Sequence, residues 1–117
     1  MSNEYLAGLF DGEGCVTYSN KPVLRKGKKK AYPIWNIRLE IAMTCKETIQ
    51  YALDTFGCGH MNFRPKLPHQ TMDQWRWRCS HRDALQCAKR MFPHSITKKE
   101  KLENIIKHYE IKDSRSI

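Results

Sequence analysis

Two carboxylates, Asp11 and Glu13, lie in the second half of the glycine-rich segment YLAGLFDGEGCV, which begins at Tyr5. Carboxylate oxygens are preferred ligands of hard cations such as Mg²⁺, which is often shared between a protein carboxylate and phosphate oxygens. A cation held in this way can activate water for phosphodiester hydrolysis and stabilise the leaving oxygen. The same acids could instead only cap a turn at the end of a short helix. The residues alone leave both interpretations open.

The second group of residues that could do chemistry is basic. The 117 residues include 21 Lys and Arg against 12 Asp and Glu, which gives a formal net charge of +9. Such an excess favours a polyanionic partner, either nucleic acid or an anionic membrane surface. A basic enzyme whose charge serves only solubility is the alternative. Because no apolar run reaches the length of a membrane span, we expect no membrane partner.

Arg and Asn recur in the segments that are patterned as strands. Their planar donor sets match the edges of guanine and adenine in the major groove, where an antiparallel sheet can lie while basic loops grip phosphates. A solvated sheet face decorated with charges would show the same alternation. On the nucleic-acid interpretation, the residues expected to contact double-stranded DNA are Thr17, Ser19, Lys21, Arg25, Lys28, Lys29, Lys30, Asn36, Arg38, Glu40, Asn62, Arg64, Arg76 and Arg78.

Apolar periodicity and capping residues predict where the first helices lie. Residues 4–11 form a short helix, and Gly12 is placed to end it in the left-handed conformation. A second helix begins at Thr44, which has the spacing of a capping box with Glu47, and ends at Gly57.

Two further helices and four strands complete the predicted order. The helices begin at Ser80 and Thr97, and the strands are 14–20, 33–43 and the segments GHMNFRP and QWRWRC. This order predicts an α+β fold, αββαββα with an extra C-terminal helix, in which one face of a four-stranded antiparallel curved sheet is covered by helices. We expect residues 1–117 to form a single domain.

The first helix has a face without side-chain bulk. Gly8 and Gly12 stand four residues apart with Ala7 beside them, although Gly weakens a helix interior by about 1 kcal/mol relative to Ala. A small face lets another helix approach closely, either within the chain or from a second copy. Because the chain has one such segment, a two-fold homodimer is expected. Its interface is predicted to contain Ala7, Gly8, Asp11 and Gly12.

Such a dimer would give Glu13 a chemical role. Both copies of Glu13 would emerge together at the negative ends of helix dipoles, which is unfavourable unless cations neutralise the two charges. Two carboxylates that face a DNA backbone would make a site for a hard divalent cation.

The five cysteines, Cys15, Cys45, Cys58, Cys79 and Cys87, form an odd set without a C-x-x-C pair. This pattern argues against a zinc knuckle and a closed disulfide framework. We therefore expect reduced, mostly buried thiols in an intracellular reducing compartment, either the cytoplasm or that of an organelle- or phage-encoded protein. The N-terminus lacks the layout of a signal peptide, so secretion is not expected.

The segment LAGLFDGEG, residues 6–14, resembles the LAGLIDADG motif that names a family of homing endonucleases. Phe10 replaces an aliphatic residue, and Gly12 and Glu13 are common variants. The predicted order of elements is similar to that family's domain over nearly the whole chain. One motif per chain resembles the homodimeric branch, in which the motif helices form the interface and each sheet reads one half-site.

The resemblance implies intron homing through metal-dependent cleavage of double-stranded DNA at a long, near-palindromic site. It implies that Glu13 is catalytic and binds Mg²⁺ or Mn²⁺, with the backbone carbonyl of Gly14 or Cys15 as a further ligand. It implies that Lys98 is the basic residue near the cleavage site and that Asp11 is chiefly structural. Lys98 could also be a solvated surface charge. No small-molecule substrate is implied.

One position departs from the family's pattern. Ala42 stands where the family often has a polar residue such as Gln to position water. A DNA-binding regulator without catalysis therefore stays as an alternative. An RNA-binding intron-splicing cofactor is another, although no solvent-facing aromatic platform for unpaired bases is evident in the sequence.

Overall fold

The computed structural model describes residues 2–24, 26–27 and 31–114. Its elements follow the predicted order. They are α1 (Ser2–Glu13), β1 (Gly14–Leu24), β2 (Ala31–Met43), α2 (Lys46–Phe56), β3 (His60–Arg64), β4 (Gln74–Ser80), α3 (His81–Met91), the short 3₁₀ helix η1 (Phe92–His94) and α4 (Lys99–Ser114).

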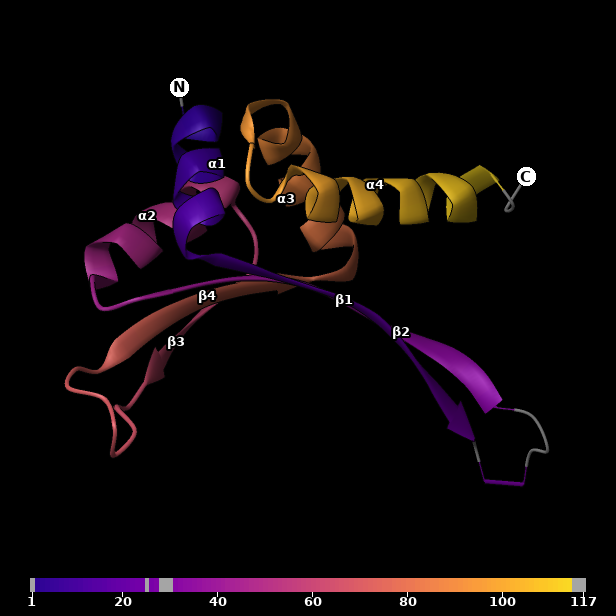
Figure 1. Ribbon diagram of the computed structural model, residues 1–117, viewed down its shortest axis with the longest axis horizontal. Coiled ribbons are helices and arrows are strands. Elements are labelled where there is room, and N and C mark those ends of the chain that lie inside the picture. The colour runs from indigo at the N-terminus through magenta and orange to yellow at the C-terminus, as the bar shows by residue number, and fades with distance from the viewer. Residues whose placement is uncertain (1, 25, 28–30, 115–117) are drawn as a thin grey trace.

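The four strands form one antiparallel sheet in the order β1-β2-β4-β3. The helices lie over one side of this sheet, and the sheet arches away from them so that its open face is concave (Figure 1). The predicted α+β fold, including the extra C-terminal helix α4, is therefore confirmed. Among the described residues, every helix is too short or too polar to span a bilayer.

The strand register decides which side chains share the open face. Thr17 pairs with Arg38 and Ser19 with Asn36, and paired residues of neighbouring strands point to the same side. Both strands extend beyond the predicted ranges, so β1 and β2 form a long ribbon that projects past the helices (Figure 1). A shift of the strand register by one residue would move every polar side chain of this ribbon to the opposite face. It would also expose Ile37, which is buried in the core, so the observed register is favoured.

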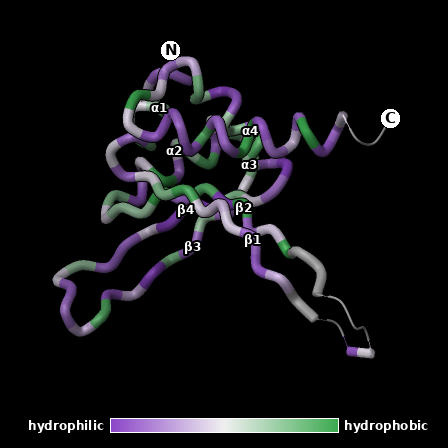
Figure 2. Tube along the Cα trace, turned by 45° about the vertical axis from the view of Figure 1, so that its right-hand side comes forward, coloured by the Kyte–Doolittle hydropathy of each residue, from purple (hydrophilic) through white to green (hydrophobic). Residues whose placement is uncertain are grey.

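The core fills the layer between the helices and the middle of the sheet. Trp77 of β4 is fully buried, its ring stacks on Phe56 of α2 with the centroids 4.5 Å apart, and its Nε1 donates to the Cys58 carbonyl at 2.9 Å. Full burial of such a side chain contributes about 1.5–3 kcal/mol. Figure 2 shows hydrophobic positions around this layer and mostly hydrophilic positions along the arm formed by β3 and β4.

The prediction that Gly12 ends the first helix is wrong. Helix α1 continues to Glu13, and β1 begins at the next residue, so no left-handed turn residue separates the two elements. The glycine that this junction needs is Gly14, because an added Cβ there would lie 2.5 Å from the backbone oxygen of Phe10. Gly12 lies inside the helix with open space around it.

The other helix ends are predicted with mixed success. Gly57 ends α2 with a left-handed φ of 73° and donates to the Leu53 carbonyl at 2.9 Å, as expected. Ser80 precedes α3 as expected. The predicted capping box at Thr44 is wrong, because α2 begins at Lys46 and its N-cap residue is Cys45.

Candidate nucleic-acid interface and carboxylate site

The register places the predicted DNA-contacting side chains of the strands together on the open, concave face. These are Thr17, Ser19, Lys21, Asn36, Arg38, Glu40, Asn62, Arg64, Arg76 and Arg78. Arg25, Lys28, Lys29 and Lys30 lie outside the described residues. The prediction missed His60 and Gln74, which pair with Arg78 and Arg64 on the same face. The alternation of polar residues in β3 and β4 would have been sufficient to find them.

A single carboxylate, Glu40, organises two arginines at the centre of this face. Its Oε1 lies 3.0 Å from Nε of Arg38 and 3.1 Å from Nε of Arg78. The contacts are ion pairs rather than hydrogen bonds, because neither Nε–H is aligned with the carboxylate. Arg38 precedes Glu40 by two positions on β2, and Arg78 stands opposite it on β4. The two guanidinium groups are therefore held close together with a net positive charge.

Arg76 is a poorly compensated cation of the open face. Its Nε is buried and has no hydrogen-bond partner among the described residues. Burial lowers the pKa of Arg76, and the positive charges of Arg78, Arg64 and Arg38 lower it further against the opposing effect of Glu40. Because an arginine stays protonated in proteins, the lowered pKa marks an unfavourable charge. An anion on this face would relieve it.

Asp11 ties the end of α1 to the beginning of α4. Its carboxylate accepts hydrogen bonds from the hydroxyl of Ser95 at 2.5 Å and from the backbone N–H groups of Ile96, Thr97 and Lys98 at 2.7, 3.3 and 3.2 Å. Burial raises the pKa of Asp11, but these hydrogen bonds outweigh it and hold the pKa below its ordinary value. The predicted cap at Thr97 is wrong, because α4 begins at Lys99. Asp11 instead holds the backbone of residues 96–98, directly before that helix.

Lys98 and Glu13 come to the same end of α1. The ammonium of Lys98 donates to the backbone carbonyl of Asp11 at 3.0 Å, where a cation is favourable because the negative end of the helix dipole lies there. Glu13 is the last residue of that helix, and its side chain is exposed. The structure thus brings together the two residues predicted to be catalytic, which are separated by most of the chain.

The oxygen atoms that one chain offers at the end of α1 are too few to enclose a metal ion, but they suit a cation that is shared with phosphate. Among the described residues, no group of three His, Cys, Asp or Glu side chains is close enough to hold a metal ion. Asp11 uses its carboxylate for the hydroxyl of Ser95 and the backbone of residues 96–98, which leaves the exposed Glu13 and nearby carbonyls such as that of Gly14. Mg²⁺ commonly combines one or two carboxylates with phosphate oxygens and water.

The small face of α1 is exposed at two of its predicted positions. Gly8 and Gly12 are exposed, and a Cβ added to either would meet nothing within 4 Å. Ala7 is fully buried in the core beside Leu6, so its predicted place in a dimer interface is wrong. It lies on the core side of the helix, three residues before the equally buried Phe10. Asp11 is half-buried and directs its carboxylate to α4.

The cysteines divide into two groups. Cys58, Cys79 and Cys87 form a cluster in which Sγ of Cys87 lies 3.4 Å from that of Cys58 and 3.8 Å from that of Cys79. Burial and the neighbouring Cys87 raise the pKa of Cys58 to about 12, so this thiol stays protonated. Cys15 and Cys45 are exposed, so the expectation that the thiols are mostly buried is wrong for these two.

Comparisons with known proteins give structural matches only. No protein-family model matches the chain, and no curated protein matches it in sequence. The homing endonuclease I-CvuI, in complex with its target in the presence of Ca, matches with a TM-score of 0.69 at 14% identity, over 91% of this chain and 64% of that one. The archaeal intron-encoded homing endonuclease I-Vdi141I, complexed with DNA, matches with a TM-score of 0.67 at 14% identity, over 89% and 64%.

The LAGLIDADG homing endonuclease I-GzeII, in complex with its DNA target, matches with a TM-score of 0.70 at 14% identity. That match covers 97% of this chain but only 36% of I-GzeII, and this chain also spans less than two thirds of I-CvuI and I-Vdi141I. The resemblance to LAGLIDADG homing endonucleases is confirmed for the fold.

Replacement of Asp11 by Asn tests the tie between α1 and α4. We expect Asp11→Asn to lower the free energy of unfolding by about 1–3 kcal/mol at pH 7, because a neutral amide is a weaker acceptor for four donors. The pKa of Asp11 in the folded protein is below its ordinary value of about 3.9. The stabilisation by the Asp11 charge is therefore fully present above about pH 3.9 and is lost as the pH falls through the folded pKa. Urea unfolding followed by circular dichroism at several pH values measures both effects.

The matched control is Asp54→Asn, which removes an exposed carboxylate that accepts from Gln50 on the same helix. We expect this change to cost at most about 0.5 kcal/mol. Equal losses for the two variants, or a loss for Asp11→Asn that persists undiminished in acid, would contradict the assigned role of Asp11.

Proposed function

We propose that this chain, which has the fold of the LAGLIDADG homing endonucleases, forms a homodimer that cleaves duplex DNA at a long, near-palindromic site with divalent cations. The observation that carries the proposal is the convergence of Arg38, Arg64, Arg76 and Arg78 on one concave sheet face. Their mutual repulsion is unfavourable in the free protein and would be relieved by a polyanion.

The arched sheet would lie in the major groove and read bases through its arginine and asparagine side chains. Glu40 holds Arg38 and Arg78 at adjacent positions, which reduces the freedom that each guanidinium would lose on binding a guanine. Lys21 on the ribbon and Lys26 in its turn are exposed and would contact phosphates, which gives a salt-dependent affinity.

The end of α1 would be the cleavage site. A bound Mg²⁺ or Mn²⁺ there would supply an activated water and polarise the scissile phosphate. The exposed Glu13 and the carbonyl of Gly14 would hold the cation. The ammonium of Lys98, which the Asp11 carbonyl positions, would stabilise negative charge on the phosphate.

The homodimer would form through the small face of α1. Gly8 and Gly12 each weaken the helix by about 1 kcal/mol relative to Ala, and the free chain gains no close contact in return. Packing of two such faces would bring two copies of α1 together and place both Glu13 side chains near the two-fold axis.

Cleavage of a randomised duplex library in the presence of Mg²⁺ tests the activity. We expect discrete cut sites, and we expect Glu13→Gln to lower the cleavage rate by about 100-fold or more while the duplex affinity in Ca²⁺ changes little. Lys98→Met should also slow cleavage strongly. Lys99→Met is the matched control, because Lys99 contacts the Phe92 ring and should be dispensable. Binding without any cutting would favour a DNA-binding regulator, for which Ala42 on the open face is the supporting feature.

Arg76 allows DNA binding to be separated from folding. We expect Arg76→Gln to weaken duplex binding by about 1–3 kcal/mol and to leave the free energy of unfolding unchanged or raised, because it removes a half-buried cation that neighbouring arginines repel. Fluorescence anisotropy with labelled duplex and urea unfolding measure the two quantities. A purely structural Arg76 would show the reverse, with lost stability and unchanged affinity.

A bulky residue on the small face tests the dimer. We expect Gly8→Gln to raise the stability of the free chain by up to about 1 kcal/mol through helix propensity and to shift sedimentation from dimer to monomer. Lys89→Gln, at an exposed position of α3, is the control that should leave association unchanged. A dimer that survives Gly8→Gln would place the interface elsewhere.

A further inference from the structure

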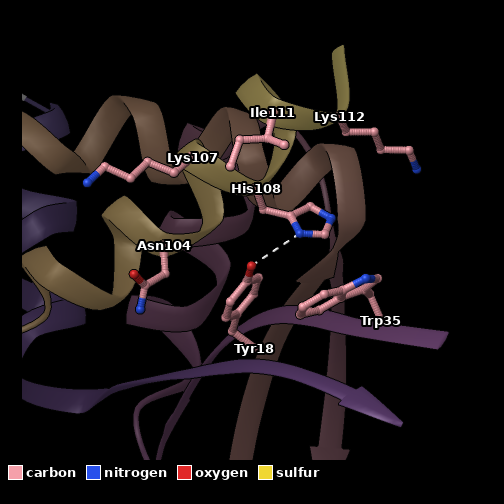
Figure 3. A pocket seen from close by; sticks show the side chains of 7 residues that line it. All are labelled: Tyr18, Trp35, Asn104, Lys107, His108, Ile111 and Lys112. Carbon is pink, nitrogen blue, oxygen red and sulfur yellow. Dashed lines mark hydrogen bonds between the residues drawn. The ribbon is translucent and has the colours of Figure 1, made fainter. Parts of the chain in front are cut away.

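An open pocket of about 480 Å³ lies on the helix-covered side of the sheet, away from the concave face. Figure 3 shows it between α4 and the β1–β2 ribbon, with Tyr18 and Trp35 below and Asn104, His108 and Ile111 above. Tyr18 pairs with the buried Ile37, which shows that it points to the helix side. The pocket is within the size range of small-molecule sites, and the proposed cleavage of duplex DNA does not use it.

The pocket has a rigid aromatic wall. The rings of Tyr18 and Trp35 stack with centroids 5.1 Å apart and an interplanar angle of 26°, and the ring of His108 stands edge-on to Trp35 at 4.7 Å. The Tyr18 hydroxyl and Nδ1 of His108 are hydrogen-bonded at 3.2 Å (Figure 3). Half-buried rings held in this way provide a surface for a further flat ring. This aromatic wall, which forms only when α4 packs beside the ribbon, is not evident in the sequence.

The rim of the pocket is polar and positively charged. The side-chain amide of Asn104 offers both donors and an acceptor, and Lys107 and Lys112 stand at either side of His108 (Figure 3). Nζ of Lys107 is 2.8 Å from Glu103, and its side chain is still largely exposed. Burial lowers the pKa of His108, and the charges of Lys112 and Arg82 lower it further, which indicates a positive potential inside the pocket.

We propose that this pocket binds an unpaired nucleotide of a single-stranded nucleic acid. The base would lie against Trp35 and Tyr18 with its edge at Asn104, and the flanking phosphates would meet Lys107 and Lys112. Aromatic stacking beside a cationic track is how sequence-tolerant single-strand sites work. A duplex would not fit, because its bases are paired and stacked. The strand would continue along the helix side of the ribbon towards the exposed Asn20.

Fluorescence anisotropy with labelled ten-nucleotide oligomers of uridine and of thymidine tests the proposal on the full chain without divalent cations. We expect both oligomers, or one of them, to bind, and a saturating unlabelled duplex not to displace them. An abasic ten-nucleotide backbone of the same charge should bind about tenfold more weakly or worse, because it cannot stack. Equal binding of the abasic strand, displacement by duplex, or no binding of either oligomer would overturn the proposal.

Substitutions locate the site. We expect Trp35→Leu to weaken oligomer binding about tenfold or more while duplex affinity is unchanged. Tyr51→Leu is the matched control, because Tyr51 is an exposed aromatic residue on α2 outside the pocket. If Trp35→Leu fails to fold, the exposed residues Asn104 and Lys112 provide a second variant, Asn104→Ala with Lys112→Gln, which should show the same selective loss. A loss no larger than that of Tyr51→Leu, with the second variant also unaffected, would overturn the proposal.

Discussion

The hydrogen bonds from residues 95–98 to the Asp11 carboxylate are the interaction on which the functional geometry depends. They fix the last turn of α1 against the segment that leads into α4. Through this tie the ammonium of Lys98 reaches the end of α1 near Glu13. The same tie sets the start of α4, whose far half forms one side of the aromatic pocket. One charged acceptor, held in a half-buried site by four donors, therefore positions two separate regions.

Three surfaces of the molecule carry features that are unfavourable for the isolated chain. The open sheet face gathers arginines around a single carboxylate and leaves Nε of Arg76 without a hydrogen bond in the described structure. The exposed side of α1 has Gly8 and Gly12 where larger residues would fit. The ribbon leaves Trp35 half-exposed beside α4. Features that are unfavourable for stability occur at functional sites more often than elsewhere. Each of these surfaces has one proposed partner: duplex DNA for the open face, a second copy of the chain for α1, and an unpaired nucleotide for the pocket beside Trp35.

Much of the fold could be predicted because its signals are local. The alternation of Ile37, Leu39 and Ile41 with polar neighbours gave both the strand and its buried face, and the same parity placed Arg76 and Arg78 on the open face. Capping was less predictable. Thr44 and Thr97 have the right residue types and spacing for caps, yet the N-cap residue of α2 is Cys45, and the segment before α4 is bound by the distant Asp11. A local pattern cannot reveal a donor or acceptor that arrives from elsewhere in the chain.

The sequence by itself determined the order of elements, the two faces of the sheet, the excess of positive charge and the acidic motif, because each depends on residue type and short spacing. Only the tertiary structure decided that Ala7 belongs to the core, that Asp11 binds the segment before α4, that Lys98 reaches the end of α1, and that Tyr18, Trp35 and His108 line a pocket. These contacts join residues far apart in the chain. They depend on how α1 and α4 pack on the sheet, and that packing is a property of the whole core rather than of any one segment.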